Sequence, residues 1–436
     1  MSNDVVKAVS SSARKFKNLR WYILILFLIG VTVNYITRNS LGILASELIS
    51  DLKMTTEQYS YVVASFQLAY TIFQPLCGWF IDVIGLKIGF AICAVIWSVA
   101  CMLHAGAGNW IQLAILRFIM GGSEAGATPA NAKVIAEWFP KKERPVAAGW
   151  AGVGFSIGAM LAPPIIVIFH VALGWKGAFI VSGALALVWV LLWWKFYHNP
   201  DKHPNLSVEE HQYIEQDQEP VQEKLSFFKS IKILSKERKF YGICIPAFLA
   251  EPAWAVFSFW VPLYLAREMG MELKQIALFA WLPFLAADLG SIASGYLTKL
   301  YIKFFGFTRI NSVIASSVTG AFLMLSLALI AVTKDPYVVI LLISIGGFGH
   351  QVISCMLSAL VVDCFDKGQV ATMNGLRGSS AWIASFLFSL IIGAFSETIG
   401  FNPLFVAMGF FDLIGAIFLI TLVGERRKKA SALNNQ

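Results

Sequence analysis

Runs of about 20 consecutive apolar residues, each long enough to cross a bilayer as a helix, recur along nearly the whole chain. A helix satisfies its own backbone hydrogen bonds, which the hydrocarbon core of a membrane requires. Hydrophobic residues make up 57% of the 436 residues and charged residues 14%, whereas a soluble chain would have about 25% charged residues. The sequence therefore predicts an all-α integral membrane protein.

We predict twelve transmembrane helices, in two sets of six separated by one long polar segment. The predicted spans are 21–45, 58–83, 87–107, 110–138, 145–170, 174–197, 239–266, 273–300, 309–332, 337–364, 369–396 and 401–423. Such a pattern is typical of two six-helix bundles related as a repeat. The predicted domains are a tail (1–20), a bundle (21–197), a linker (198–238), a second bundle (239–424) and a second tail (425–436).

Lysines and arginines between the spans lie mostly on one side of this topology, which predicts that both termini and the linker are cytoplasmic. This bias also accounts for the net charge of +8 without a nucleic-acid partner. The polar tail Met1–Arg20 leads directly into a full-length span, so we expect no cleavable signal peptide. In the linker, Ser207 and Glu210 predict the capped start of a surface helix over Leu206–Gln216.

Charged side chains inside the predicted spans are the strongest functional signal. Arg38 and Glu124 fall near the middle of spans one and four, and Arg117 lies on the same helical face as Glu124, two turns away. A charge at the bilayer centre costs about 2.5–3.5 kcal/mol even on a lenient scale. These groups therefore face a protein interior or a hydrated cavity, and intramembrane ionisable residues default to a functional interpretation.

Arg38, with Tyr35 one turn before it, is the best candidate for binding an anion, because a guanidinium matches a carboxylate bidentately. The alternative is a structural arginine paired with Glu124. Glu124 is the best candidate for carrying a proton: burial favours a neutral carboxyl, a nearby arginine favours the charged form, and a substrate anion can shift that balance. The alternative is a static Arg117–Glu124 ion pair. Arg117 itself is either the partner of this switch or a second substrate ligand.

Other polar groups inside the spans are weaker candidates for substrate contacts. Gln67 and Tyr70 place hydrogen-bonding groups on one face of span two, although a polar contact between helices is equally plausible. Trp254 in span seven is either a sugar platform or a packing residue. His350 and Asn374 are polar groups in spans ten and eleven.

Gly78, Asp82, Gly85 and Lys87 surround a short turn between spans two and three, where an acidic helix end and a basic turn predict a breakable clasp. The chain has no phosphate-binding loop, and no nucleophile–base pair stands in a recognisable frame. Its six cysteines show no paired spacing, so we expect neither disulfides nor a metal site. We predict no cofactor and no enzyme activity. A secondary transporter driven by an ion gradient fits these observations.

Several segments resemble known transporters. The stretch GWFIDVIGLK resembles the signature of the major facilitator superfamily, with Val83 where a basic residue is usual. The segments NYIT before Arg38, RFIMGGSEA and AEWFPKKER resemble the anion:cation symporter family, which moves organic anions such as sugar acids. The hexuronate branch of that family is similar in QYSYVVASFQLAYTIFQP, SIGAMLAPP, FLAEPAWAVF, FAWLPFLAADLG, GGFGHQ and NGLRGSSAWIAS.

This resemblance implies that Arg38 binds the substrate carboxylate, that Arg117 and Glu124 form a charge pair, and that Glu124 is protonated during the cycle. Thr37 stands where related sugar-acid symporters often have Asp, so the resemblance implies coupling through Glu124. Ala247 stands where the nearest hexuronate relatives are expected to have arginine.

The expected function is proton-coupled import of a hexuronate, glucuronate or galacturonate, by a monomer in the bacterial inner membrane. The alternatives are a transporter of another organic anion such as galactonate, an anion antiporter, and a membrane receptor or enzyme. The expected partners are the organic anion, protons and the bilayer.

Overall fold

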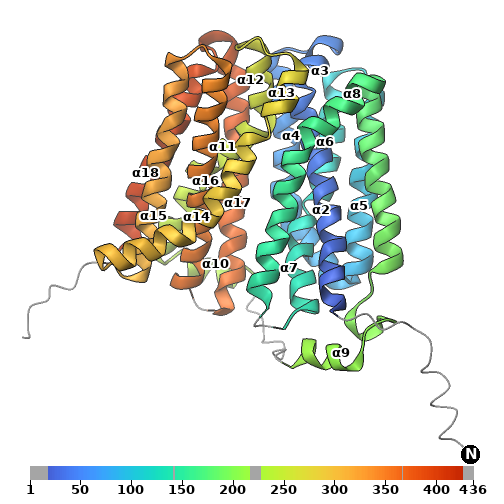
Figure 1. Cartoon of the computed structure of the whole chain (residues 1–436), viewed down its shortest axis with the longest axis vertical. Helices are drawn as coiled ribbons and strands as arrows, with labels where there is room; N and C mark the ends of the chain where they lie inside the picture. Colours follow the sequence, from blue (N-terminus) through green and yellow to red (C-terminus); the bar gives the residue numbers. More distant parts are fainter. Residues whose placement is uncertain (1–17, 141–142, 217–226, 366, 426–436) are drawn as a thin grey trace, which may run out of the picture. The chain divides into compact units, whose positions relative to one another are not determined.

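The computed structural model describes residues 18–140, 143–216, 227–365 and 367–425, and these are almost entirely helical (Figure 1). Lys141 and Lys142, the two lysines of the stretch AEWFPKKER, lie outside the described residues. The α-helices are α2 (Leu19–Ile43), α3 (Ala45–Asp51), α4 (Thr56–Ile84), α5 (Leu86–Leu103), α6 (Trp110–Glu124), α7 (Ala127–Trp138), α8 (Arg144–Phe196), α9 (Val208–Glu215), α10 (Phe227–Leu234), α11 (Arg238–Ala255), α12 (Val261–Arg267), α13 (Leu273–Phe279), α14 (Leu282–Phe305), α15 (Arg309–Met324), α16 (Pro336–Cys364), α17 (Lys367–Ile399) and α18 (Asn402–Leu422).

Nine helical stretches of the described chain are each long and apolar enough to cross a membrane. These stretches contain ten of the predicted spans, because the stretch in α8 contains two, and the other two predicted spans are also helical. Two predicted spans run together in α8 and are divided at Gly174, whose φ of 70° lies in the left-handed region that favours glycine. Of the other two, predicted span 58–83 lies in the more polar α4, and predicted span 110–138 is divided into α6 and α7. The predicted all-helical, twelve-span fold is confirmed.

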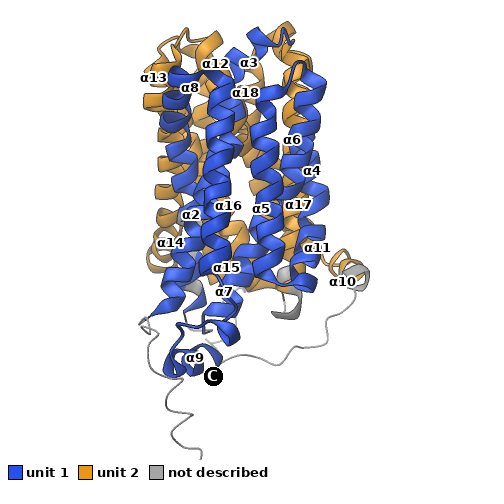
Figure 2. Cartoon of the chain, turned by 90° about the vertical axis from the view of Figure 1, so that its right-hand side faces the viewer, with its two compact units in different colours: residues 1–54, 65–223 blue, residues 55–64, 224–436 orange. Residues whose placement is uncertain are grey.

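The chain divides into two compact units (Figure 2). Unit 1 comprises residues 1–54 and 65–223, and unit 2 comprises residues 55–64 and 224–436. Residues 55–64 were expected in the first bundle, but they group with unit 2. Their contacts explain this: the Tyr59 hydroxyl donates to the carbonyl oxygen of Phe259 at 2.9 Å, and the Arg267 guanidinium donates to Thr56 Oγ1 at 2.7 Å.

In unit 1, close approach of backbones holds α2 against α8. A Cβ added to Gly158 would lie 2.6 Å from the carbonyl oxygen of Thr32, so only glycine allows this approach. The Trp189 indole donates to the carbonyl oxygen of Leu26 at 2.9 Å. Small residues at such contacts are typical of membrane helices, where packing rather than the hydrophobic effect holds helices together.

In unit 2, glycines also allow the backbones of neighbouring helices to approach closely. The centre of α16 packs on α14 and α15, and a Cβ on Gly349 would lie 2.6 Å from the carbonyl oxygen of Gly320. The helix α11 contacts α17 and α18. After Pro252, α11 passes into a π-helical segment, Val256–Trp260, before α12 begins. Prolines and π-bulges are ordinary causes of helix irregularity.

The linker helix α9 belongs to unit 1, and hydrogen bonds and an ion pair hold it against the start of α2. Ser207 caps it as predicted, accepting from the backbone N–H of Glu210 at 3.1 Å. The Glu210 carboxylate does not return to the Ser207 backbone, as a full capping box would require. It accepts instead from the backbone N–H of Leu19 at 2.9 Å and from Arg20 Nη1 at 2.8 Å. Arg20 also donates to Glu143, which precedes α8.

Replacing Glu210 by alanine should lower the thermal unfolding midpoint of the purified protein. The change leaves the first N–H groups of α2 and the Arg20 side chain without their buried acceptor, at a cost of about 1–3 kcal/mol. Glu215→Gln on the same helix is the control, because the Glu215 side chain is 56% exposed and pairs with His211 at the surface. Equal midpoints for the two variants would contradict a fastening role for Glu210.

Candidate functional site

Arg38, in the middle of α2, is enclosed by aromatic rings and one carboxylate. Its guanidinium carbon lies 4.4 Å from the ring centroid of Tyr35, 4.9 Å from that of Tyr70 and 5.4 Å from that of Phe66. Its Nε donates to Glu124 Oε2 at 2.8 Å, and the Arg38 side chain is only 5% exposed. Cation–π contacts are stronger when desolvated, so this box suits a cation inside a membrane.

Glu124 is the last residue of α6, and its side chain is fully buried. Thr37 Oγ1 lies 3.3 Å from its second oxygen, Oε1, so both carboxylate oxygens face α2. The helix breaks just after Glu124, before α7 begins at Ala127. Hydropathy predicted one continuous span here, and the break shows that Glu124 occupies a helix end rather than a helix interior.

Gly121 sets the distance between α6 and α4. A Cβ at this position would overlap the carbonyl oxygen of Phe66 and lie 3.0 Å from the Phe66 Cα. Gly122 faces the ring of Phe73 in the same way, at 3.2 Å. The two glycines therefore bring α6 against the part of α4 that carries Phe66 and Tyr70.

Arg117 lies close to this pair, but the ion pair of Glu124 is with Arg38. Arg117 Nη1 donates to the carbonyl oxygen of Arg38 at 3.4 Å, and its guanidinium carbon lies 4.4 Å from the Phe66 ring centroid. Arg117 also acts electrostatically on Glu124, so the expected Arg117–Glu124 pair stays a prediction. The alternative pairing of Glu124 with Arg38 is present in the structure.

Four amide side chains of unit 1 have buried atoms without a described hydrogen-bond partner, and Asn34 and Gln67 are two of them. Both amide atoms of Gln67 lack a hydrogen-bond partner among the described residues. The Asn34 oxygen accepts from Arg38 Nη2 at 3.4 Å, while its Nδ2 has no described partner. Asn34 was missed in the sequence analysis, although a polar residue four positions before Arg38 on an apolar helix was an available signal. Unsatisfied buried amides are rare and costly, which marks positions where a polar ligand can bind.

In unit 2, the candidates Trp254 and His350 are in contact with each other, and Asn374 contacts Arg377. The Trp254 and His350 rings stack at 5.8 Å, and Phe284 packs edge-on against Trp254 at 5.4 Å. His350 is buried, and its Nδ1 has no described hydrogen-bond partner. Asn374, on α17, accepts from Arg377 Nε at 3.4 Å. Arg377 also acts electrostatically on Glu251.

The residues of the predicted clasp lie in unit 1, and Asp82 pairs with a lysine that the prediction did not include. Asp82 Oδ1 is 2.7 Å from Lys133 Nζ, which also donates to the carbonyl oxygen of Ile81. Gly85 has a φ of 89° and precedes α5. Gly78 packs against Pro129. Lys87 lies instead over the ring of Trp194, with its Nζ 5.6 Å from the centroid.

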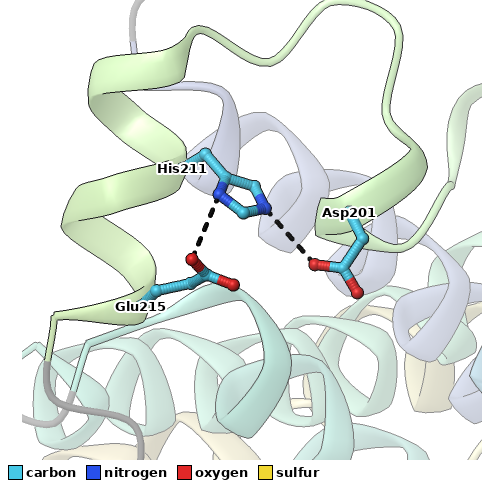
Figure 3. Close-up of side chains that lie close together, drawn as sticks. All are labelled: Asp201, His211 and Glu215. Atoms are coloured by element: carbon cyan, nitrogen blue, oxygen red, sulfur yellow. Dashed lines mark hydrogen bonds and ion pairs between the residues drawn. The ribbon is translucent and has the colours of Figure 1, made fainter.

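One group of potential metal ligands, Asp201, His211 and Glu215, occurs among the described residues (Figure 3). Its geometry is that of ion pairs. Asp201 lies 3.3 Å from His211 Nε2, and Glu215 lies 3.4 Å from Nδ1 of the same ring. One ligand atom from each of the three residues lies within 4.8 Å of the others. The predicted absence of a metal site stays a prediction.

Comparison with known proteins places this arrangement in a family. The sequence profile described as Major Facilitator Superfamily matches residues 27–363 and 307–436. The chain belongs to the major facilitator superfamily. It is therefore a multi-span membrane protein of a transporter family, and its relatives are named transporters.

Two relatives of this major facilitator protein are similar over most of their length. The "Hexuronate transporter" of Escherichia coli (strain K12) is 45% identical over 95% of this chain and 96% of its own. The "Galacturonate transporter" of Dickeya chrysanthemi is 43% identical over 75% of this chain and 95% of its own. A solved bacterial homologue of the human lysosomal transporter Spinster has a TM-score of 0.75 at 17% identity, covering 93% of this chain and 97% of its own, which shows the shared fold.

Replacing Gly121 by alanine should destabilise the protein by about 1–3 kcal/mol, because the added methyl group forces α6 away from Phe66. The thermal unfolding midpoint of the purified variant measures this effect. Gly295→Ala is the control: it lies in α14 with nothing within 4 Å of the added Cβ, and alanine favours a helix. A Gly121→Ala variant as stable as Gly295→Ala would show that α6 and α4 are not in tight contact.

Proposed function

We propose that this protein imports a hexuronate, such as glucuronate or galacturonate, together with protons. It acts as a monomer in the bacterial inner membrane, with both termini and the linker in the cytoplasm. The named activities of the two relatives at 45% and 43% identity support the substrate class. The distribution of lysine and arginine supports the orientation.

The observation that carries the proposal is that the Arg38 guanidinium already binds a carboxylate, that of Glu124. Glu124 Oε2 sits on Arg38 Nε at 2.8 Å, inside a box formed by Tyr35, Phe66 and Tyr70. A guanidinium that binds an internal carboxylate here is suited to bind a substrate carboxylate. Substrate and Glu124 then compete for the same cation.

A charge balance explains how this competition couples substrate to protons. Arg38, Arg117 and ionised Glu124 carry a net charge of +1 (two positive, one negative). A substrate anion alone would change it to 0, and a proton on Glu124 alone would change it to +2. Proton and substrate together restore +1, because one carboxylate replaces the other. If substrate displaced the ionised carboxylate from Arg38, Glu124 would be left as a buried charge without its partner, so it takes up a proton as the substrate binds.

In this proposal Tyr35, Tyr70 and Gln67 of unit 1 contact the sugar hydroxyl groups. Trp254, His350 and Asn374 of unit 2 remain predicted substrate-binding residues. The Trp254 indole offers an apolar face to the sugar ring. Gly78, Asp82, Gly85 and Lys87 serve as the conformational clasp, which opens and closes as access alternates between the two sides of the membrane.

Uptake into sealed proteoliposomes tests the function directly. An inwardly directed proton gradient should drive accumulation of labelled glucuronate, and unlabelled galacturonate should compete for it. Preferred competition by galactonate would identify another organic anion as the substrate. Exchange without any response to the proton gradient would indicate an antiporter. Binding without accumulation would point to a receptor or an enzyme.

Arg38→Lys should weaken glucuronate binding about 10- to 100-fold, although the charge is kept. Lysine cannot reproduce the fork of donors that a carboxylate accepts, and charge-assisted hydrogen bonds contribute about 1.5–3 kcal/mol each. Calorimetry on the purified variant measures the affinity. Arg309→Lys is the control, since the Arg309 side chain is 72% exposed and pairs with Asp363. Unchanged affinity in Arg38→Lys would exclude bidentate binding at this residue.

Glu124→Gln should abolish proton-driven accumulation of glucuronate but retain exchange of substrate across the membrane. The neutral amide neither ionises nor takes up a proton near neutral pH, and it leaves Arg38 available to substrate at every pH. Asp412→Asn is the matched control, because Asp412 is another acid buried within a membrane helix, outside the proposed site. If Glu124→Gln loses exchange and binding as well, Glu124 does more than carry the proton.

A further inference from the structure

A basic cavity of unit 1 lies outside the substrate site described above. It has a volume of about 230 Å³ and lies where the end of α4, the start of α5 and the segment after α8 meet. Its polar lining includes Lys87, His198 and Lys202, and its apolar lining includes Ile84 and Ile88. We call it the Lys87 pocket.

The charges of this pocket favour an anion. Lys87 and Lys202 both line it, and no described carboxylate does so. The nearby Asp201 carboxylate contacts His211 instead. His198 Nδ1 is buried and has no hydrogen-bond partner among the described residues. Burial first, and the charge of Lys87 second, lower the pKa of His198, so its ring is neutral and Nδ1 is suited to bond a hydroxyl group.

The apolar residues around the pocket indicate which kind of molecule the anionic group belongs to. Ile88 lines the pocket and begins an exposed apolar stripe that runs along α5. The members of the stripe are Ile88, Ile92, Val95, Val99 and Leu103, each between 39% and 55% exposed. On α8, Trp194 is 53% exposed and lies beneath Lys87. In a membrane protein this stripe faces acyl chains, and a tryptophan beside a lysine is typical of the headgroup level.

We propose that the Lys87 pocket binds the headgroup of an anionic, hydroxylated phospholipid such as phosphatidylglycerol. Lys87 and Lys202 bind the phosphate, His198 bonds a headgroup hydroxyl, and one acyl chain lies along the stripe from Ile88 to Leu103. Basic pockets at the ends of membrane helices are suited to lipid headgroups. A free phosphate could use the two lysines but would leave the apolar stripe unused.

Native mass spectrometry of the delipidated, full-length protein tests this proposal. The protein is titrated with phosphatidylglycerol, with phosphatidylcholine of the same acyl chains, and with inorganic phosphate. Wild-type protein should bind the first phosphatidylglycerol more tightly than phosphatidylcholine. Lys202→Gln should weaken that binding about fivefold, and Lys202→Glu should weaken it further, because one lysine near an anionic headgroup contributes about that much.

Lys195→Gln and Lys195→Glu are the matched controls, because Lys195 is exposed at the end of α8 but does not line the pocket. Their affinity for phosphatidylglycerol should equal that of wild type. Lys202 is exposed, so its variants should keep the wild-type unfolding midpoint. Equal affinity in wild type and Lys202→Glu would overturn the proposal. So would equal binding of the two lipids, or displacement of phosphatidylglycerol by inorganic phosphate at similar concentrations.

Discussion

The buried ion pair between Arg38 and Glu124 is the interaction on which the rest of unit 1 depends. An arginine at this depth cannot lose its charge, and leaving it unpaired would cost far more than packing could offset. Its needs are met from three helices: a carboxylate at the end of α6, ring faces of α2 and α4, and the Asn34 oxygen one turn before it. Gly121 allows α6 to approach α4 closely, and α6 ends at Glu124. Both features allow the three helices to meet at Arg38.

The same pair is also the reason that the site is suited to move an anion rather than only to hold the helices together. A buried pair is weak evidence for stability, since its desolvation cost can exceed its attraction. The pair in this protein adjoins a second arginine, Arg117, so the cluster carries an excess positive charge. Unsatisfied amides at Asn34 and Gln67 add hydrogen-bonding groups without described partners. The excess positive charge and the unsatisfied amides would destabilise a static core, but in a binding site they can bind an anionic, hydroxylated substrate.

Hydropathy and charge alone predicted the twelve spans, the capped start of α9 and the two ionisable groups at the centre of unit 1. They did not predict which groups touch, because a sequence shows spacing along one helix but not which helices are neighbours. The Arg38–Glu124 pair was one of the alternatives that the sequence left open, and the pair of Asp82 with Lys133 was not predicted. The break between α6 and α7 was hidden as well, since Gly121 and Gly126 fit a continuous apolar run.

The central claim is that substrate replaces the Glu124 carboxylate on Arg38 and that Glu124 then takes up a proton. Calorimetric titration of the purified protein with glucuronate, in buffers of different ionisation enthalpy, measures the protons exchanged on binding. The account predicts net proton uptake when substrate binds near neutral pH, and no such uptake in a protein whose Glu124 cannot ionise. Binding without proton exchange, or with net proton release, would contradict it.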